Sequence, residues 1–206
     1  MNTKINSTNR RQFLTALGIG ASGYALGSLL IHPEVAMGQS IEGYLEKVST
    51  ETRWRIAVRS YLSWQIMCLQ EIYDKRGREK FLEHFKKMSV LWAPGQKQLA
   101  DQLGFTGNDA KSTAAIMSAL LIVWWGPTGK YEIEEATGEK VKLKSLVCPF
   151  WNEVQSRKIT EDLCSQRCQW WSDNFAKARN AKLTSTLVKA RPLGDLACEW
   201  IIDHKA

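Results

Sequence analysis

The chain has 206 residues and a formal net charge of +7, with 28 Lys and Arg against 21 Asp and Glu. Once a leader over residues 1–38 is set aside, the length fits one domain with a hydrophobic core of its own. In the remaining segment, residues 39–206, basic side chains are interspersed with acids. This pattern is typical of a solvated surface and argues against nucleic acid as a partner.

The leader has the layout of an export signal. Arg10 and Arg11 precede an uncharged run over residues 13–31, and small residues follow up to Gly38. The basic pair directly before Phe13 resembles the twin-arginine signal, which implies that the twin-arginine export machinery carries the folded protein to the periplasm. An uncleaved signal would instead hold the protein on the membrane through this segment.

Apolar residues at steps of three and four predict helices over about residues 52–123. The first of these helices is expected to end at Gly77, because glycine is a common helix terminator. A second helix follows, and Pro94 is expected to break it. The last helix of this part is expected to begin at a cap formed by Asn108 or Asp109.

The pattern changes to period two after residue 129, which predicts a β-hairpin with a turn at residues 136–138. In the expected register, apolar side chains share one face and acids oppose lysines on the other, so a slip by one residue would mix the two faces. The expected pairs are Tyr131 with Leu143, Glu132 with Lys142, Ile133 with Val141 and Glu134 with Lys140.

Residues 160–180 return to a helical pattern, with Thr160 available as the cap. Two strand-like runs close the chain, from Lys182 to Ala190 and from Cys198 to about residue 202. Helices, hairpin, helix and hairpin in this order predict a single α+β domain with an antiparallel sheet. The sheet-containing part covers about residues 130–202.

Four of the five cysteines lie in the second half of the chain, and a helix packed on the sheet would bring them together: Cys148, Cys164, Cys168 and Cys198. Three interpretations stay open. An oxidising compartment permits disulfides. Four thiolates suit zinc or an iron–sulfur cluster, although the spacing matches no compact metal motif. The thiols can also be buried apolar groups or include a single nucleophile.

Tryptophan is abundant, with nine residues in the chain, several of them close together in sequence: Trp124, Trp125, Trp151, Trp170 and Trp171. A Trp ring buries a large area but keeps one N–H group that needs a partner, so such rings build either a core or the wall of a polar cavity. The cluster is compatible with a ligand pocket.

The second half of the chain contains four short motifs: Cys148-Pro149-Phe150, Asp162-Leu163-Cys164 with Cys168, Leu193-Gly194-Asp195 and Cys198-Glu199-Trp200. These motifs resemble the L-2-amino-thiazoline-4-carboxylic acid hydrolase-like family, which is similar to the vinyl-4-reductase group of small-ligand-binding domains. The resemblance implies an α+β fold with a small-molecule pocket. For active members it also implies hydrolytic opening of a thiazoline or related cyclic amide ring.

Such a reaction needs a nucleophile or activated water, a proton relay and a group that holds the substrate. Cys148 is the candidate nucleophile or metal ligand, and Asp195 and Glu199 are candidate relays. Arg191 is the candidate carboxylate binder. Trp151 and Trp171 are candidate walls of the substrate pocket. Plain alternatives are turn chemistry for Asp195 and an exposed strand position for Glu199.

Two functions follow as hypotheses. The first is an exported small-molecule-binding or hydrolase-like protein whose site contains Cys148, Cys164, Cys168 and Cys198. The alternative is a non-catalytic accessory protein of a periplasmic redox system that binds a metal or cofactor through the same four thiols. The accessory-protein hypothesis is motivated by export in the folded state and by the lack of a Ser-His-Asp or paired-His arrangement in the sequence.

Overall fold

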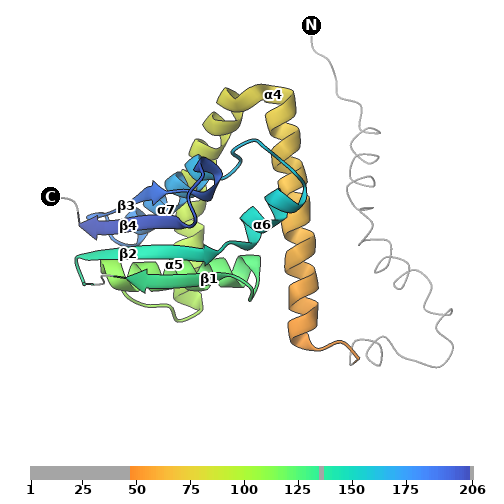
Figure 1. Ribbon diagram of the computed structural model, residues 1–206. Helices are drawn as coiled ribbons and strands as arrows, with labels where there is room; N and C mark the ends of the chain where they lie inside the picture. Colours follow the sequence, from red (N-terminus) through yellow and green to blue (C-terminus); the bar gives the residue numbers. More distant parts are fainter. Residues whose placement is uncertain (1–46, 135–136, 205–206) are drawn as a thin grey trace, which may run out of the picture. The chain divides into compact units, whose positions relative to one another are not determined.

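The computed structural model describes residues 47–134 and 137–204 (Figure 1). The chain divides into two units, residues 1–53 and 54–206, and all elements from Trp54 onward belong to the second. The predicted twin-arginine leader lies outside the described residues. Within the described ranges, no helix is both long enough and apolar enough to cross a membrane.

Helix α4 (Thr50–Gln102) consists of two arms that meet at a bend (Figure 1). Gly77 makes the bend with φ 74° and ψ 167°, values that are not helical, so the predicted helix end is confirmed. The predicted break at Pro94 is wrong, because the second arm continues through this residue to Gln102. Pro94 lies on the exposed side of the arm, where water can reach the carbonyl of Val90 that lacks an N–H partner.

Helix α5 (Ala110–Trp125) begins with a reciprocal cap. The backbone N–H of Ser112 donates to Oδ1 of Asp109 at 2.7 Å, and the N–H of Asp109 donates to Oγ of Ser112 at 3.2 Å. Asp109 is therefore the predicted N-cap. The helix ends at Gly126, whose φ of 94° favours glycine and whose N–H donates to the carbonyl of Ile122.

The sheet has four antiparallel strands in the order β1-β2-β4-β3, which confirms the predicted α+β class. The strands are β1 (Lys130–Glu134), β2 (Lys140–Val147), β3 (Leu183–Lys189) and β4 (Cys198–His204), and a short 3-10 helix, η2 (Arg191–Leu193), joins the last two.

The predicted hairpin exists, but its register is shifted by two residues. Ile133 lies opposite Leu143 rather than Val141, and Glu134 lies opposite Lys142 rather than Lys140. A shift of two keeps every side chain on its own face, so the alternation of apolar and charged residues could not distinguish the two registers. The connection between the strands is correspondingly longer than the predicted three-residue turn.

The two faces of the sheet differ in chemistry. Helices α5 and α7 (Ser165–Arg179) cover the inner face, where Val141, Leu143 and Trp200 belong to the first apolar cluster. The outer face carries charged pairs. Glu199 is only 7% exposed, and its carboxylate lies 3.1 Å from Nζ of Lys189 and 4.0 Å from Nζ of Lys144.

A second apolar cluster joins both arms of α4 to helix α6 (Pro149–Ser156), with Phe81, Phe85, Phe150 and Val154 among its buried members. Helix α6 was not predicted. Helix α7 begins at Ser165 rather than near Thr160, because Oδ1 of Asp162 accepts the backbone N–H groups of Cys164 and Ser165. The Asp162 carboxylate thus takes the capping role predicted for Thr160.

The bend in α4 generates a stability prediction with a matched control. Gly77→Ala should lower the free energy of unfolding by about 1–3 kcal/mol, because only glycine adopts this backbone conformation readily. Gly95→Ala should raise it by about 0.4–1 kcal/mol, since Gly95 is helical and has open space around the position of an added Cβ. Urea denaturation of both variants measures the difference. Equal stabilities would contradict the assigned bend.

Candidate functional site

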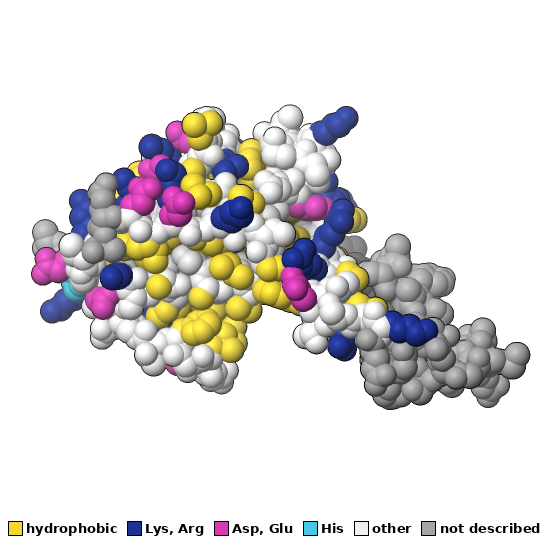
Figure 2. All heavy atoms as spheres, turned by 60° about the horizontal axis from the view of Figure 1, so that its bottom comes forward, with side chains coloured by type: hydrophobic (Ala, Val, Ile, Leu, Met, Phe, Trp, Pro, Cys, Tyr) yellow, Lys and Arg dark blue, Asp and Glu magenta, His cyan; other side chains and the backbone are white. Residues whose placement is uncertain are grey.

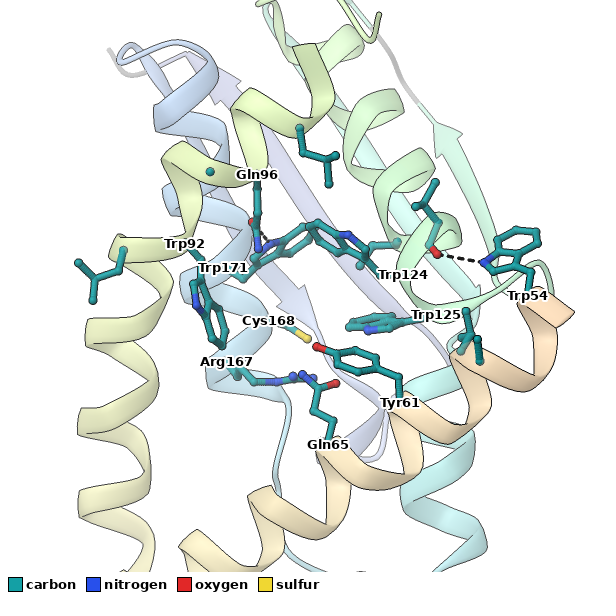
Figure 3. A pocket seen from close by; sticks show the side chains of 17 residues that line it. Trp54, Tyr61, Gln65, Trp92, Gln96, Trp124, Trp125, Arg167, Cys168 and Trp171 are labelled. Carbon is teal, nitrogen blue, oxygen red and sulfur yellow. Dashed lines mark hydrogen bonds between the residues drawn. The ribbon is translucent and has the colours of Figure 1, made fainter. Parts of the chain in front are cut away.

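A cavity of about 650 Å³ lies between the two arms of α4, the end of α5 and helix α7 (Figure 3). Its walls are mainly aromatic. Five tryptophans line it: Trp54, Trp92, Trp124, Trp125 and Trp171. Among these five, only Trp171 was predicted as a binding residue. The structure places its ring in the cavity wall.

Two of these rings are held in place by hydrogen bonds to other residues that line the cavity. Nε1 of Trp171 donates to Oε1 of Gln96 at 2.6 Å, which links α7 to the second arm of α4. Nε1 of Trp54 donates to the carbonyl of Val123 at 3.3 Å. Because these N–H groups have partners in the protein, the rings present mostly carbon surface to a ligand.

Apolar side chains also surround the opening of the cavity. Tyr61, Leu91, Trp92 and Val123 all line it, and they are between 37% and 70% exposed. Figure 2 shows a face of the molecule on which apolar side chains gather between charged ones. An accessible concave surface lined by carbon with a few polar groups is the usual form of a small-molecule site.

Four polar side chains gather at one end of the cavity, and Gln96 lies away from them (Figure 3). Figure 3 shows the hydroxyl of Tyr61, the thiol of Cys168, the amide of Gln65 and the guanidinium of Arg167 close to one another. Arg167 is 8% exposed, and its guanidinium carbon lies 4.0 Å from the centroid of the Phe150 ring. Nε and Nη2 of Arg167 and Oε1 of Gln65 are buried without a hydrogen-bond partner among the described residues.

Cys168 links this cavity to the other thiols. It packs against both apolar clusters, shares a hydrogen bond with Cys164, and interacts electrostatically with Cys148 and Cys198. Cys164 and Cys168 are thus in direct contact, and a shared site of all four thiols stays a prediction. All five cysteines of the chain are free thiols in this structure.

The thiols differ in acidity. Burial raises the pKa of Cys148 to about 12 and that of Cys198 to about 11. The hydrogen bond between Cys164 and Cys168 lowers the pKa of Cys168 and raises that of Cys164, and the charge of Arg167 also favours the Cys168 thiolate. Cys168 is consequently the most acidic of the four, and it is the one that lines the cavity.

Cys148 and Asp195 have structural partners of their own. The sulfur of Cys148 caps α6 by accepting the backbone N–H of Trp151 at 3.5 Å. Oδ2 of Asp195 accepts the N–H of Ala190 at 2.8 Å within the turn that contains η2. Trp151 packs against the second apolar cluster and does not line the cavity.

Arg191 and Glu199 also lie away from the cavity. The Arg191 guanidinium donates through Nη2 to the carbonyl of Leu146, and its backbone N–H donates to the sulfur of Cys198 at 3.4 Å. Glu199 belongs to the outer face of the sheet, where it pairs with lysines, whereas its neighbour Trp200 points to the inner face. The predicted nucleophile, relays and carboxylate binder are therefore not gathered around one cavity, and their catalytic roles stay predictions.

The cysteines are the candidate ligands of the predicted metal centre. Among the described residues, no group of three or more His, Cys, Asp or Glu side chains is placed to hold a metal ion. Two of the four sulfurs, those of Cys148 and Cys198, already accept backbone N–H groups. As arranged, the four thiols do not present a tetrahedral ligand set for zinc or a cluster, and the metal site stays a prediction.

The cavity residues that sequence reasoning missed come from separate segments. Trp54, Tyr61 and Gln65 belong to the first arm of α4, and Trp92 to the second. Arg167 carried a usable signal, since it lies between Cys164 and Trp171 on the apolar stripe of α7. A charged residue within an apolar stripe indicates either a buried partner or a ligand.

No protein-family model matches this chain, and no curated protein matches it. Solved structures with a related fold exist. One is the phenol-responsive sensory domain of the transcription activator PoxR with phenol, at a TM-score of 0.53 and 11% identity, covering 69% of this chain and 74% of that one.

Another is a trafficking protein particle complex subunit 3 from Naegleria fowleri covalently bound to palmitic acid. Its TM-score is 0.50 at 11% identity, with coverage of 75% of this chain and 96% of that one. At such low identity, the two likenesses show that the fold is shared.

The arrangement of thiols predicts site-selective alkylation. At pH 7.5, iodoacetamide should modify Cys168 at least about tenfold faster than Cys148 or Cys198, because more of the Cys168 thiol is ionised. Peptide mass spectrometry of quenched samples measures the three rates. Cys164→Ala should slow the reaction at Cys168, since the variant loses the thiol that hydrogen-bonds its sulfur. Labelling of Cys148 or Cys198 before Cys168 would contradict the assignment.

Proposed function

We propose that the protein binds a small molecule with an aromatic or otherwise apolar body in the tryptophan-lined cavity. The observation that carries the proposal is the cavity itself, about 650 Å³ in volume and lined by five Trp rings. This volume falls within the range of roughly 300–1,000 Å³ that is usual for small-ligand pockets. Large aromatic walls supply contact area, while the few polar groups at one end orient the ligand.

The fold neighbours support the same use. The PoxR sensory domain was solved with phenol, and the trafficking subunit with covalently bound palmitic acid. Phenol has an aromatic body, and palmitic acid has a long apolar chain. Both bodies are apolar, as are the walls of the cavity in this protein. We infer that this chain uses the shared fold to hold an apolar ligand body.

The geometry favours a protein that binds its ligand without catalysing a reaction. Only Cys168 and Trp171 of the residues predicted for the site line the cavity. Cys148, with its pKa raised to about 12, carries very little thiolate near neutral pH and is a poor nucleophile. Thiazoline hydrolysis through Cys148, Asp195 and Glu199 stays a prediction that turnover of thiazoline carboxylates would establish.

The proposal predicts stabilisation by neutral aromatic probes. Phenol or naphthalene at about 100 times its Kd should raise the Tm of the wild-type protein by roughly 5–10 °C, because a ligand that binds only the folded state stabilises it. Trp92→Ala should weaken binding about tenfold, since this ring forms part of the wall. Differential scanning calorimetry and isothermal titration measure both effects.

Trp64→Ala is the matched control for this test. Trp64 lies on the first arm of α4, is 54% exposed and does not line the cavity. The control variant should bind phenol and naphthalene as the wild type does. If the wild type binds none of the aromatic probes, or if the two Trp variants lose affinity equally, the proposed use of the cavity is wrong.

A further inference from the structure

Arg167 places a permanent positive charge in an apolar environment. Its side chain is 8% exposed and stacks against Phe150, with the Trp125 ring centroid 5.9 Å from its guanidinium carbon. A buried charge is costly unless another charge or a set of hydrogen bonds compensates it. Ring stacking stabilises the cation in part, and the guanidinium also hydrogen-bonds the Cys168 side chain, but Nε and Nη2 are left without acceptors.

No acidic side chain among the described residues forms an ion pair with Arg167. Asp162 is an acid in the surroundings of Cys168, but its carboxylate is used elsewhere. Oδ1 accepts the backbone N–H groups of Cys164 and Ser165 at 3.0 Å and 2.8 Å, and Oδ2 accepts the Ser165 hydroxyl. The carboxylate is therefore committed to the start of α7.

The two nitrogens of Arg167 that lack partners form a defined recognition edge. Nε and Nη2 lie on the same side of the planar guanidinium, so their N–H bonds point nearly parallel. Two parallel N–H donors match the two oxygens of a carboxylate, which is the strongest common form of arginine recognition. A Lys side chain could supply the charge but not this pair of directions.

The charged side chains that line the cavity indicate which net charge its ligand carries. Arg167 is the only charged side chain among the described residues that line it. A monoanion balances one cation, whereas a phosphate dianion would leave charge uncompensated in an apolar site. Next to Arg167, Gln65 offers an amide whose N–H groups can donate to a carboxylate, and Tyr61 offers a hydroxyl (Figure 3).

We propose that the ligand of this cavity is a monocarboxylate with an aromatic or apolar body, held at its carboxylate by the Nε and Nη2 edge of Arg167. This inference rests on the proposed function, because it names the chemical class of the molecule bound there. The rings of Trp92, Trp124 and Trp171 contact the body, and Gln65 lies beside the carboxylate. The Cys168 side chain lies beside Arg167 at the same end of the cavity.

The experiment compares 2-naphthoate with 2-naphthamide, which have nearly the same shape and differ in charge. Isothermal titration of the wild-type protein should show naphthoate binding about 30-fold more tightly than the amide, which corresponds to hydrogen bonds with a charged group. Arg167→Met should remove this preference while it leaves the affinity for naphthamide within about threefold. Arg167→Lys should retain part of the preference, because the charge stays and the paired donors are lost.

Arg191→Met is the matched control. Arg191 is half-buried, and like Arg167 it has a buried Nε that lacks a partner, but it lies outside the cavity. This variant should keep the wild-type preference for naphthoate. The wild-type comparison by itself tests the inference even if Arg167→Met does not fold.

The outcomes separate the two proposals. If wild type binds both probes equally well, or if Arg167→Met keeps the preference for naphthoate, the carboxylate inference is overturned and small-molecule binding stands. If wild type binds neither probe nor phenol, both proposals fail. As a second readout, saturating naphthoate should slow alkylation of Cys168 at least about tenfold, whereas naphthamide should slow it less, because only the anion competes for the charge of Arg167.

Discussion

The stacking of the Arg167 guanidinium on Phe150 is the contact around which the site is organised. Phe150 belongs to α6 and to the second apolar cluster, and Arg167 projects from α7 toward the cavity. The contact lets a charged side chain remain within an apolar interior, since the ring face accepts the cation while the guanidinium edge stays unused. This unused edge gives an otherwise apolar cavity a preferred ligand orientation and charge.

The remaining architecture keeps space open next to that contact. Gly77 turns α4 back on itself, so its two arms form opposite walls, and the Trp171 hydrogen bond to Gln96 ties α7 to the second arm. The charged pairs of the sheet lie on the opposite, outer face, where Glu199 joins Lys144 and Lys189. The two faces of the sheet are therefore stabilised differently. The inner face packs under helices and borders the thiols, and the outer face is stabilised by cross-strand charge pairs.

Much of the fold could be predicted because it depends on local patterns. The bend at Gly77, the cap at Asp109 and the two closing strands follow from glycine chemistry, capping chemistry and alternation. The hairpin register could not be predicted, since a shift of two residues preserves both faces. The helix continues through Pro94 because water can reach the carbonyl of Val90. The exposure of this carbonyl depends on the tertiary structure and could not be predicted from the sequence.

The site was harder to predict than the fold. Cysteine spacing pointed to the neighbourhood of Cys164 and Cys168, whose thiols share a hydrogen bond. The cavity beside them is built by Trp54, Trp92 and Arg167, which are distant in sequence and meet only after α4 bends. Arg191 was predicted as the carboxylate binder because its planar guanidinium suits a carboxylate, whereas Arg167, which has the same chemistry, was not singled out.

A crystal structure of the full chain with 2-naphthoate tests the central claim most directly. The account predicts ligand density in the tryptophan-lined cavity, with both carboxylate oxygens within about 3.2 Å of Nε and Nη2 of Arg167 and the rings against Trp92, Trp124 or Trp171. Naphthoate bound elsewhere on the protein, or an Arg167 edge paired with a carboxylate of the protein itself, would contradict it.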